Sequence, residues 1–248
     1  MELALLDFDN TLTTNEGIIL NETINDIKKY VINNKICIIS NSSFNELNEF
    51  KNKNNLDISF YSLSNMKGLI LNEILESELN YNLINDLFLK FKDYIYTAWS
   101  NDLLNSYIYN YQERLNFLYP KEKRIIINNL EKNINYIIIA INIGIYDEFY
   151  EYLNELNLGY EIIAKDLKRN IVKIFDKNFY NDIIFKKIIK SFNSDFTIGI
   201  GDSLDNLKFI DLCDEKIAMK DSILATKIKK TTKYDNNHNG CLDYLINR

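Results

Sequence analysis

Two carboxylates stand two residues apart near the start of the sequence, at Asp7 and Asp9 in the segment DFDNT. The apolar run LALL at residues 3–6 precedes them and predicts a short strand that ends at Asp7. Side chains at the carboxyl end of a parallel strand point into the crevice where α/β sheets bind ligands. Carboxylates placed there can act as a nucleophile, as a general acid or base, or as ligands of a hard cation. Acidic turns after strands are also common without any function, so this pair needs support from other segments.

A second polar segment, Ser40-Asn41-Ser42, follows the β-branched run KICII at residues 35–39. Such a run is typical of a strand buried on both faces in a parallel sheet. The Ser40 hydroxyl could donate a hydrogen bond to a phosphate oxygen, helped by backbone N–H groups at the start of the next helix. The alternative is that this segment caps a helix over residues 44–50.

A third segment, GDSLDN at residues 201–206, follows the apolar run FTIGI at 196–200. Gly201 permits a tight turn that places Asp202 at the end of the predicted strand. Together with Asp205 it forms an oxygen-rich acidic cluster, which suits Mg²⁺, an ion that takes carboxylates, waters and phosphate oxygens. The alternative is an acidic helix start, where the helix dipole favours Asp205.

These three segments need a common sheet to bring them together, and the two ends of the chain supply its elements. The hydrophobic spacing predicts a βαβ unit near the N-terminus and a helix followed by two strands near the C-terminus. The expected helices cover residues 21–33 and 180–192, and the expected strands cover 3–6, 35–39, 196–200 and 217–219. Both ends therefore predict one Rossmann-like parallel-sheet core of the α/β class.

The middle of the sequence predicts a separate α+β unit. Strands are expected at 94–99, 136–143, 160–164 and 171–175, and helices at 120–131, where Pro120 suits the first turn, and at 146–156. The expected organisation is a discontinuous core, residues 1–62 and 176–248, around an inserted domain of residues 63–175.

Composition excludes several classes of protein. The chain has 248 residues and a formal net charge of −6, so a general nucleic-acid binder is not expected. No apolar run is long enough for a membrane span, and the N-terminus does not resemble a signal peptide.

Three scattered cysteines exclude a disulfide framework and favour the cytoplasm. His238, the single histidine, is expected in an exposed loop, so a histidine-based triad or a multi-histidine metal site is not expected. The oligomeric state is left open.

The three polar segments, each directly after a buried strand and in this order, resemble the haloacid dehalogenase (HAD) superfamily of phosphohydrolases. The long insertion resembles the type IIB α/β cap of its Cof-type branch, and residues 61–70 resemble the segment with which that branch enters the cap. The resemblance implies that Asp7 is the nucleophile and that Asp9 is the general acid and base. It also implies that Ser40, with Asn41 beside it, binds the transferring phosphoryl group.

The same resemblance implies a Mg²⁺ ion held by Asp7, Asp202 and the backbone carbonyl of Asp9, with Asp205 as a further acidic ligand. The order of the last two residues departs from the family, whose final motif usually ends Asn-Asp, whereas this sequence has Asp205 before Asn206.

The lysine that the family carries at the start of the late helix is also displaced in this chain. The apolar face of that helix places Asn181 at the family's lysine position, and Lys177 is the nearest substitute in the preceding loop. Lys186 and Lys187 lie deeper in the helix, where a solvated face is the simpler interpretation. We therefore expect Lys177 to contact the phosphate and the nucleophile.

The resemblance implies a Mg²⁺-dependent phosphatase that acts on a small phosphorylated metabolite, such as a sugar or polyol phosphate, through an aspartyl-phosphate. Two alternatives stay open at this point. A phosphomutase or phosphotransferase would use the same scaffold with another hydroxyl in place of water, and a catalytically weak binding module would keep only the fold. The sequence identifies no substrate-specificity residue.

Overall fold

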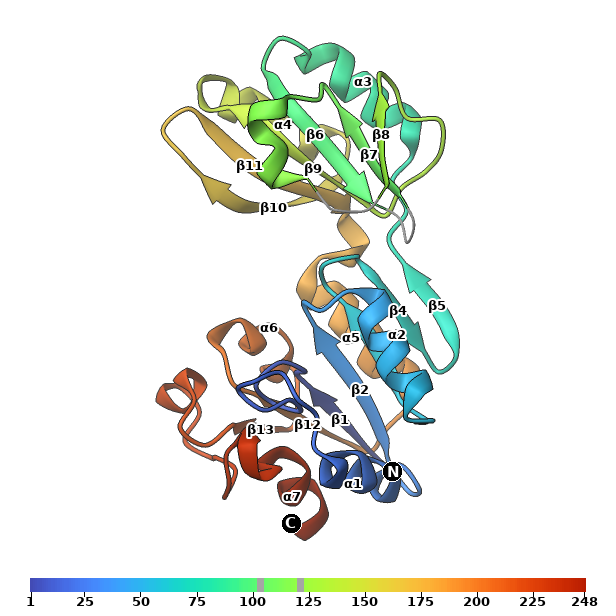
Figure 1. The fold of residues 1–248 in the computed structure, drawn as a ribbon, viewed down its shortest axis with the longest axis vertical. Coiled ribbons are helices and arrows are strands. Elements are labelled where there is room, and N and C mark those ends of the chain that lie inside the picture. The colour runs from blue at the N-terminus through green and yellow to red at the C-terminus, as the bar shows by residue number, and fades with distance from the viewer. Residues whose placement is uncertain (102–104, 120–122) are drawn as a thin grey trace. The chain divides into compact units, whose positions relative to one another are not determined.

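The computed structural model describes residues 1–101, 105–119 and 123–248 and divides the chain into two compact units (Figure 1). The first unit joins Met1–Leu75 to Asn181–Arg248, and the second unit is the continuous segment Glu76–Tyr180. The second unit is therefore inserted into the first.

The borders of the units differ from the expected ones. Residues 63–75 belong to the first unit, because β4 (Lys67–Ile70) pairs antiparallel with β3 (Ser59–Ser62) and extends its sheet. Residues 176–180 belong to the second unit, where the short helix η3 (Lys177–Phe179) lies against Gly159.

A seven-stranded sheet in the order β13-β12-β1-β2-β3-β4-β5 forms the centre of the first unit. β1 pairs parallel with both β2 and β12, and β3 and β13 extend the parallel part on either side. Because these strands are parallel, β1, β2 and β12 end at the same edge of the sheet. The strands are β1 (Glu2–Leu6), β2 (Lys35–Ser40), β3 (Ser59–Ser62), β4 (Lys67–Ile70), β5 (Glu73–Glu76), β12 (Phe196–Gly201) and β13 (Glu215–Ala218).

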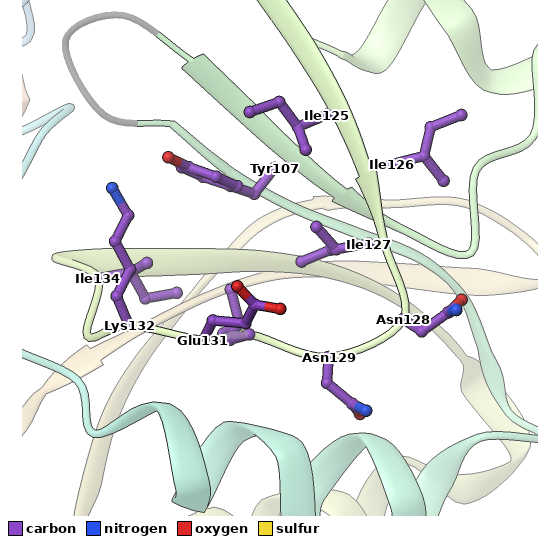
Figure 2. Close-up of a pocket in the computed structure, with 10 residues that line it drawn as sticks. Tyr107, Ile125, Ile126, Ile127, Asn128, Asn129, Glu131, Lys132 and Ile134 are labelled. Carbon is purple, nitrogen blue, oxygen red and sulfur yellow. The ribbon is translucent and has the colours of Figure 1, made fainter.

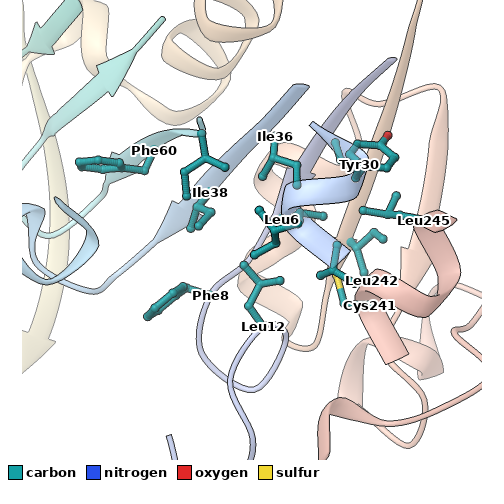
Figure 3. Close-up of a cluster of buried hydrophobic side chains, with 14 of the residues drawn as sticks. Leu6, Phe8, Leu12, Tyr30, Ile36, Ile38, Phe60, Cys241, Leu242 and Leu245 are labelled. Carbon is teal, nitrogen blue, oxygen red and sulfur yellow. The ribbon is translucent and has the colours of Figure 1, made fainter. Parts of the chain in front are cut away.

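Helices cover both faces of this sheet. On one face, α1, α2 and α7 pack against alternate residues of the central strands, such as Leu6 and Ile38 (Figure 3). On the other face, Gly199 lies so close to α6 that an added Cβ would stand 2.9 Å from the Ile210 Cα. A pair of phenylalanine rings joins α6 to α5. The helices are α1 (Asn21–Tyr30), α2 (Phe44–Lys53), α5 (Asn181–Phe192), α6 (Leu207–Ile210) and α7 (Gly240–Asn247).

The second unit contains a six-stranded sheet in the order β10-β11-β9-β6-β7-β8, antiparallel except for the β7–β8 pair. α3 (Tyr81–Phe91) and α4 (Tyr146–Glu155) pack on one face in a large apolar cluster. Trp99 and Tyr119 belong to a smaller cluster that also includes Ala140. The strands are β6 (Ile95–Asn101), β7 (Asn105–Tyr109), β8 (Lys123–Ile127), β9 (Tyr136–Asn142), β10 (Leu158–Lys165) and β11 (Arg169–Asp176).

The α/β fold class and most of the predicted elements are confirmed, but the helix expected at 120–131 is wrong. Residues 120–122 lie outside the described part of the chain, and Lys123–Ile127 form the strand β8. Three consecutive isoleucines favour an extended strand over a helix, and this local preference outweighs the proline signal. Strands β3, β4, β5 and β7 were not expected. Within the described ranges, no helix has the length and apolar character needed to cross a membrane.

Candidate functional site

Asp7 directly follows β1, the central strand of the parallel part of the first unit's sheet. Its N–H donates to the Ile200 carbonyl at 3.0 Å, so the pairing of β1 with β12 continues past Leu6. The residue is buried, and its Oδ2 accepts a hydrogen bond from Thr11 Oγ1 at 3.4 Å. The next residue, Phe8, packs into the apolar cluster under α2 (Figure 3). Because consecutive side chains of an extended segment point to opposite sides, the inward direction of Phe8 leaves the Asp7 carboxylate at the carboxyl edge of the sheet.

A tight turn follows Asp7 and is built around one carbonyl group. The Phe8 carbonyl accepts N–H bonds from residues 11–13 at 3.4, 2.9 and 3.1 Å. Asn10 adopts φ +55°, a left-handed conformation that asparagine tolerates better than most side chains. The turn leaves Asp9 exposed at the rim of the site, two residues from the buried Asp7.

Hydroxyl groups join the loop after β1 to the loop after β2. Ser42 Oγ donates to Asp9 Oδ2 at 3.0 Å, and the Ser42 N–H donates to Ser40 Oγ at 2.9 Å. The cap of α2 is Ser43, which forms a reciprocal capping box with Glu46. The buried Ser40 is therefore not the helix cap, and its hydroxyl proton has no acceptor among the residues that the structure describes.

Asp202 follows β12 at the same edge, on a turn that a buried amide holds. Asn206 Oδ1 accepts the backbone N–H groups of Asp202 and Ser203 at 3.0 and 2.9 Å. A Cβ at Gly201 would stand 2.4 Å from that same oxygen, so the turn requires glycine there. The Asp202 carbonyl also accepts the Leu224 N–H at 3.0 Å. The direction of the Asp202 side chain is thus fixed by its backbone on both sides.

The carboxylates of this edge repel one another. Burial first, and then the charge of Asp202, raise the pKa of Asp7 well above its ordinary value. Burial also raises the pKa of Asp202, and the Asp9 charge adds to this effect. Asp7 and Asp202 are close enough to share a side-chain hydrogen bond. A buried and a half-buried carboxyl group, both with raised pKa values, form a place that a cation would stabilise.

The donor set fits a hard cation with few protein ligands. No group of three His, Cys, Asp or Glu side chains suited to a metal occurs within the described ranges. Mg²⁺ does not require one, because it keeps several waters and is usually bound through one or two carboxylates and a substrate phosphate. The Asp7 and Asp202 carboxylates meet that requirement.

Two predicted site residues of the first unit, Asp205 and Asn41, are exposed, and a third, Lys177, belongs to the second unit. The Asp205 side chain is 78% exposed, and its Oδ1 lies 3.8 Å from Lys208 Nζ. Asn41 is exposed next to Ser40. Lys177 belongs to the second unit, in η3, where its Nζ donates to Asn157 Oδ1 at 3.4 Å.

The lysines of α5 lie on its solvated side. Lys186 is 64% exposed and its Nζ lies 3.8 Å from Asp182 Oδ2, one helical turn away. Lys187 is exposed as well. Asn181 begins the helix, at the position where a lysine was sought.

Two residues of the site were not predicted from the sequence. Ser42, which donates to Asp9, was named only as part of the segment after the second strand and was given no role of its own. Asn206 was noted only for its order in the motif, yet it is buried and bonds to the turn of Asp202. An amide three to four residues after a strand-ending Gly-Asp is a usable signal for such a turn.

A separate cavity of about 710 Å³ lies in the second unit (Figure 2). Ile125 and Ile127 of β8 share it with Tyr107 of β7, and the loop 128–134 closes one side. Glu131 is the only carboxylate among its described lining residues. The lining of this cavity offers apolar contacts but no paired carboxylates. The carboxyl edge of the first unit's sheet therefore remains the candidate catalytic site.

Comparison with solved structures identifies the fold. A haloacid dehalogenase-like hydrolase from Bacteroides thetaiotaomicron is similar, with a TM-score of 0.68 and 14% identity over 99% of this chain and 98% of that one. The protein TM0651 from Thermotoga maritima gives a TM-score of 0.70 with 15% identity, covering 99% and 97% of the two chains. The HAD subclass IIB sugar phosphatase BT4131 gives 0.63 with 14% identity, covering 100% and 98%.

No family model and no curated protein matches the sequence. The structural likeness extends over nearly the whole length of both chains in each case. The predicted HAD-like fold, with its Rossmann-like core and inserted α/β unit, is therefore confirmed.

Proposed function

We propose that this chain is a Mg²⁺-dependent phosphatase that hydrolyses a small phosphorylated metabolite through an aspartyl-phosphate intermediate. The observation that carries this proposal is the pair formed by the buried Asp7 and the half-buried Asp202, which follow two adjacent parallel strands in a HAD-like fold. Such a pair destabilises the fold unless a cation offsets its negative charge.

Asp7 is the proposed nucleophile. One of its carboxylate oxygens attacks phosphorus, and the bond between phosphorus and the ester oxygen of the alcohol breaks. A carboxylate needs no proton removed before it attacks, unlike a serine or a threonine. The hydrogen bond from Thr11 to Oδ2 orients the group.

Asp9 is the proposed general acid and then the general base. In the first step it donates a proton to the leaving oxygen of the alcohol. In the second step it takes a proton from the water that attacks phosphorus, and the bond between phosphorus and Asp7 breaks. Its exposure at the rim and its hydrogen bond from Ser42 suit a group that must meet both alcohol and water.

Ser40 is the proposed phosphate donor. Its oxygen already accepts the Ser42 N–H, so the hydroxyl proton is available to a phosphoryl oxygen. Asn41, exposed beside it, is proposed as a further contact with the same group.

Mg²⁺ is proposed to bind between the Asp7 and Asp202 carboxylates, with the backbone carbonyl of Asp9 as a third ligand. When bound, it would offset the negative charge of both carboxylate and phosphate. Asp205 is proposed only as an outer acidic group, given its exposure.

A sugar or polyol phosphate is the proposed substrate class, because one of the similar structures is a sugar phosphatase. Lys177 is proposed as the cation that contacts the phosphate.

The three cysteines are unpaired and buried, which suits a reducing compartment, and we propose the cytoplasm.

The test is a panel of sugar and polyol monophosphates incubated with the purified chain and Mg²⁺. We expect released inorganic phosphate, at a rate that chelation by EDTA abolishes. The Asp7→Asn variant is the matched control for contaminating phosphatases. Formation of an isomeric phosphate without free phosphate would instead indicate a phosphomutase. Absence of turnover with every ester, including p-nitrophenyl phosphate, would contradict the proposal.

A further inference from the structure

A second cavity in the second unit is basic although the chain as a whole is acidic. It measures about 300 Å³ and is lined by Tyr96, Arg114, Leu115, Asp166, Lys168 and Arg169, and we call it the basic pocket. Three cations face one carboxylate there, in a chain with a formal net charge of −6. A local excess of positive charge in a concave surface concentrates anions.

The turn between β10 and β11 holds Arg169 in place. Asp166 Oδ1 accepts the backbone N–H groups of Lys168 and Arg169 at 2.8 and 2.9 Å, and Oδ2 accepts Arg169 Nε at 2.5 Å. The backbone bond from Lys168, followed by the contacts with Arg169, lowers the pKa of Asp166, so this carboxylate stays charged. Only Nε of Arg169 is used, and its two terminal nitrogens have no partner among the described residues.

Arg114 is held in a similar way by a neutral group. Its Nε donates to Gln112 Oε1 at 2.9 Å, and the Gln112 amide donates in turn to the Tyr96 carbonyl. No carboxylate in the described part of the chain pairs with Arg114 or with Lys168. Two guanidinium groups are therefore oriented by their Nε atoms, while their charges are only partly compensated.

We infer that the basic pocket binds the oxyanion group, phosphate or carboxylate, of a small molecule. The terminal nitrogens of Arg114 and Arg169 can each donate paired hydrogen bonds to such a group, with Lys168 as a third charge. The Tyr96 ring and Leu115 provide an apolar wall for the carbon skeleton of the ligand. The volume suits a compound of a few carbon atoms rather than a nucleotide. All of these residues belong to the second unit, so binding does not require Asp7 or the metal.

Isothermal titration of the whole chain with citrate, in metal-free buffer, tests the inference. We expect binding that weakens as salt is added, because the interaction is electrostatic. Arg114→Gln and Arg169→Gln should each weaken it about fivefold or more, since each removes a charge-assisted pair. Lys165→Gln is the matched control: Lys165 is an exposed lysine on β10 that does not line the pocket, and citrate affinity should not change. Fluorescence of Trp99 checks that each variant is folded.

A parallel titration with inorganic phosphate shows which oxyanion the pocket prefers. The phosphate binding that the double variant Arg114→Gln/Arg169→Gln weakens belongs to the basic pocket, and phosphate binding that is unchanged in the double variant belongs elsewhere. If citrate, added at a constant concentration of free Mg²⁺, raises the KM of the phosphatase reaction, the anion comes from the substrate itself. If citrate binds without competing, the anion comes from a separate metabolite. Equal citrate affinity in the wild type and in both arginine variants would overturn the inference, whether or not the chain proves to be a phosphatase.

Discussion

Asn206 holds Asp202 in place: its Oδ1 accepts the Asp202 N–H at 3.0 Å and the Ser203 N–H at 2.9 Å. The amide is buried, and Gly201 leaves the space that it fills. A side chain that accepts two backbone N–H groups and carries no charge serves this turn without adding a further negative charge beside Asp7. The reversed order of Asp205 and Asn206 therefore retains a positioning role for the second residue.

The first prediction concerns this amide. Asn206→Ala leaves two buried N–H groups without acceptors, which should cost about 1–3 kcal/mol of unfolding free energy. Because Asp202 loses its fixed direction, the Mg²⁺ concentration for half-maximal activity should also rise. Asn206→Asp keeps the acceptor oxygen and should preserve most of the Mg²⁺ affinity. Urea unfolding and Mg²⁺-dependent thermal protection measure the two effects, and equal protection of the alanine variant and the wild type would contradict the role.

The second prediction concerns the nucleophile. Asp7→Asn should abolish phosphate release while the circular dichroism spectrum stays unchanged, because an amide of nearly the same shape cannot attack phosphorus. Removal of one of two repelling carboxylates should also make the metal-free protein at least as stable as the wild type. Mass spectrometry excludes deamidation of the variant. Retention of more than a few per cent of the activity would remove Asp7 from this role.

The third prediction separates the two acidic residues of the last motif. Asp202→Ala should raise the Mg²⁺ requirement at least tenfold, about 1.4 kcal/mol of lost binding. Asp205→Ala is the matched control three residues away, and its titration should move by less than about twofold because the side chain is 78% exposed and screened by solvent. Mg²⁺ titrations of phosphate release compare the variants. An unchanged curve for Asp202→Ala, or a tenfold shift for Asp205→Ala, would reverse the assignment.

The fourth prediction tests the displaced lysine. If Lys177 contacts the phosphate, Lys177→Ala should lower kcat about 100-fold, the scale of losing one preorganised charge-stabilising group. Lys186→Ala should have little effect, because that side chain is exposed and pairs with Asp182 on the helix surface. Steady-state kinetics with the same substrate give both values. Near wild-type activity of Lys177→Ala would exclude this lysine from contact with the phosphate.

The fifth prediction uses a buried lysine of the second unit. Burial lowers the pKa of Lys173 to about 8, although the charge of Glu161 partly opposes this. At neutral pH the folded state therefore holds a charged lysine at a cost, and Lys173→Met should stabilise the unit by about 1–3 kcal/mol. Between pH 8 and 10.5 the unfolded chain binds more protons than the folded one, so the stability of the wild type rises with pH.

The difference in unfolding free energy between Lys173→Met and the wild type should consequently shrink above pH 8 and be smallest near pH 10.5. Trp99, the single tryptophan, lies in an apolar cluster of the same unit and reports its unfolding in urea. Lys165→Met, on an exposed position of β10, is the control and should show no such pH-dependent difference. A constant advantage at every pH would mean that Lys173 does not titrate in this range.

The core of the first unit was predictable because its central strands are short apolar runs that are buried on both faces. Such runs are typical of parallel strands, and they predicted the strands at 3–6, 35–39 and 196–200. The hairpin of β3 and β4 was missed, since its strands are four residues long and contain serine and glycine. The strand β8 was mistaken for a helix because a proline before it suggested a helix start. In each case the local pattern was too short to decide, and pairing with a neighbouring strand decided instead.

The site was predictable where a residue directly ends a strand and less so where a turn intervenes. Asp7, Ser40 and Asp202 follow from strand ends alone. Asp205 and Asn206 stand side by side in a 3-10 turn, where consecutive side chains point about 120° apart. Adjacent positions therefore have opposite environments, exposed for Asp205 and buried for Asn206.

The pairing of β1 with β12 has a consequence for how the protein is made. Leu3 pairs with Thr197, so β1 cannot complete its pairing until β12, which follows the inserted unit in the sequence, has been synthesised. The inserted unit is continuous in sequence and can complete its own sheet earlier. During translation, a nascent chain that has not yet released β12 from the ribosome thus carries a finished second unit and an open apolar edge on β1. Chaperone binding should concentrate on that intermediate and end once β12 has emerged and paired.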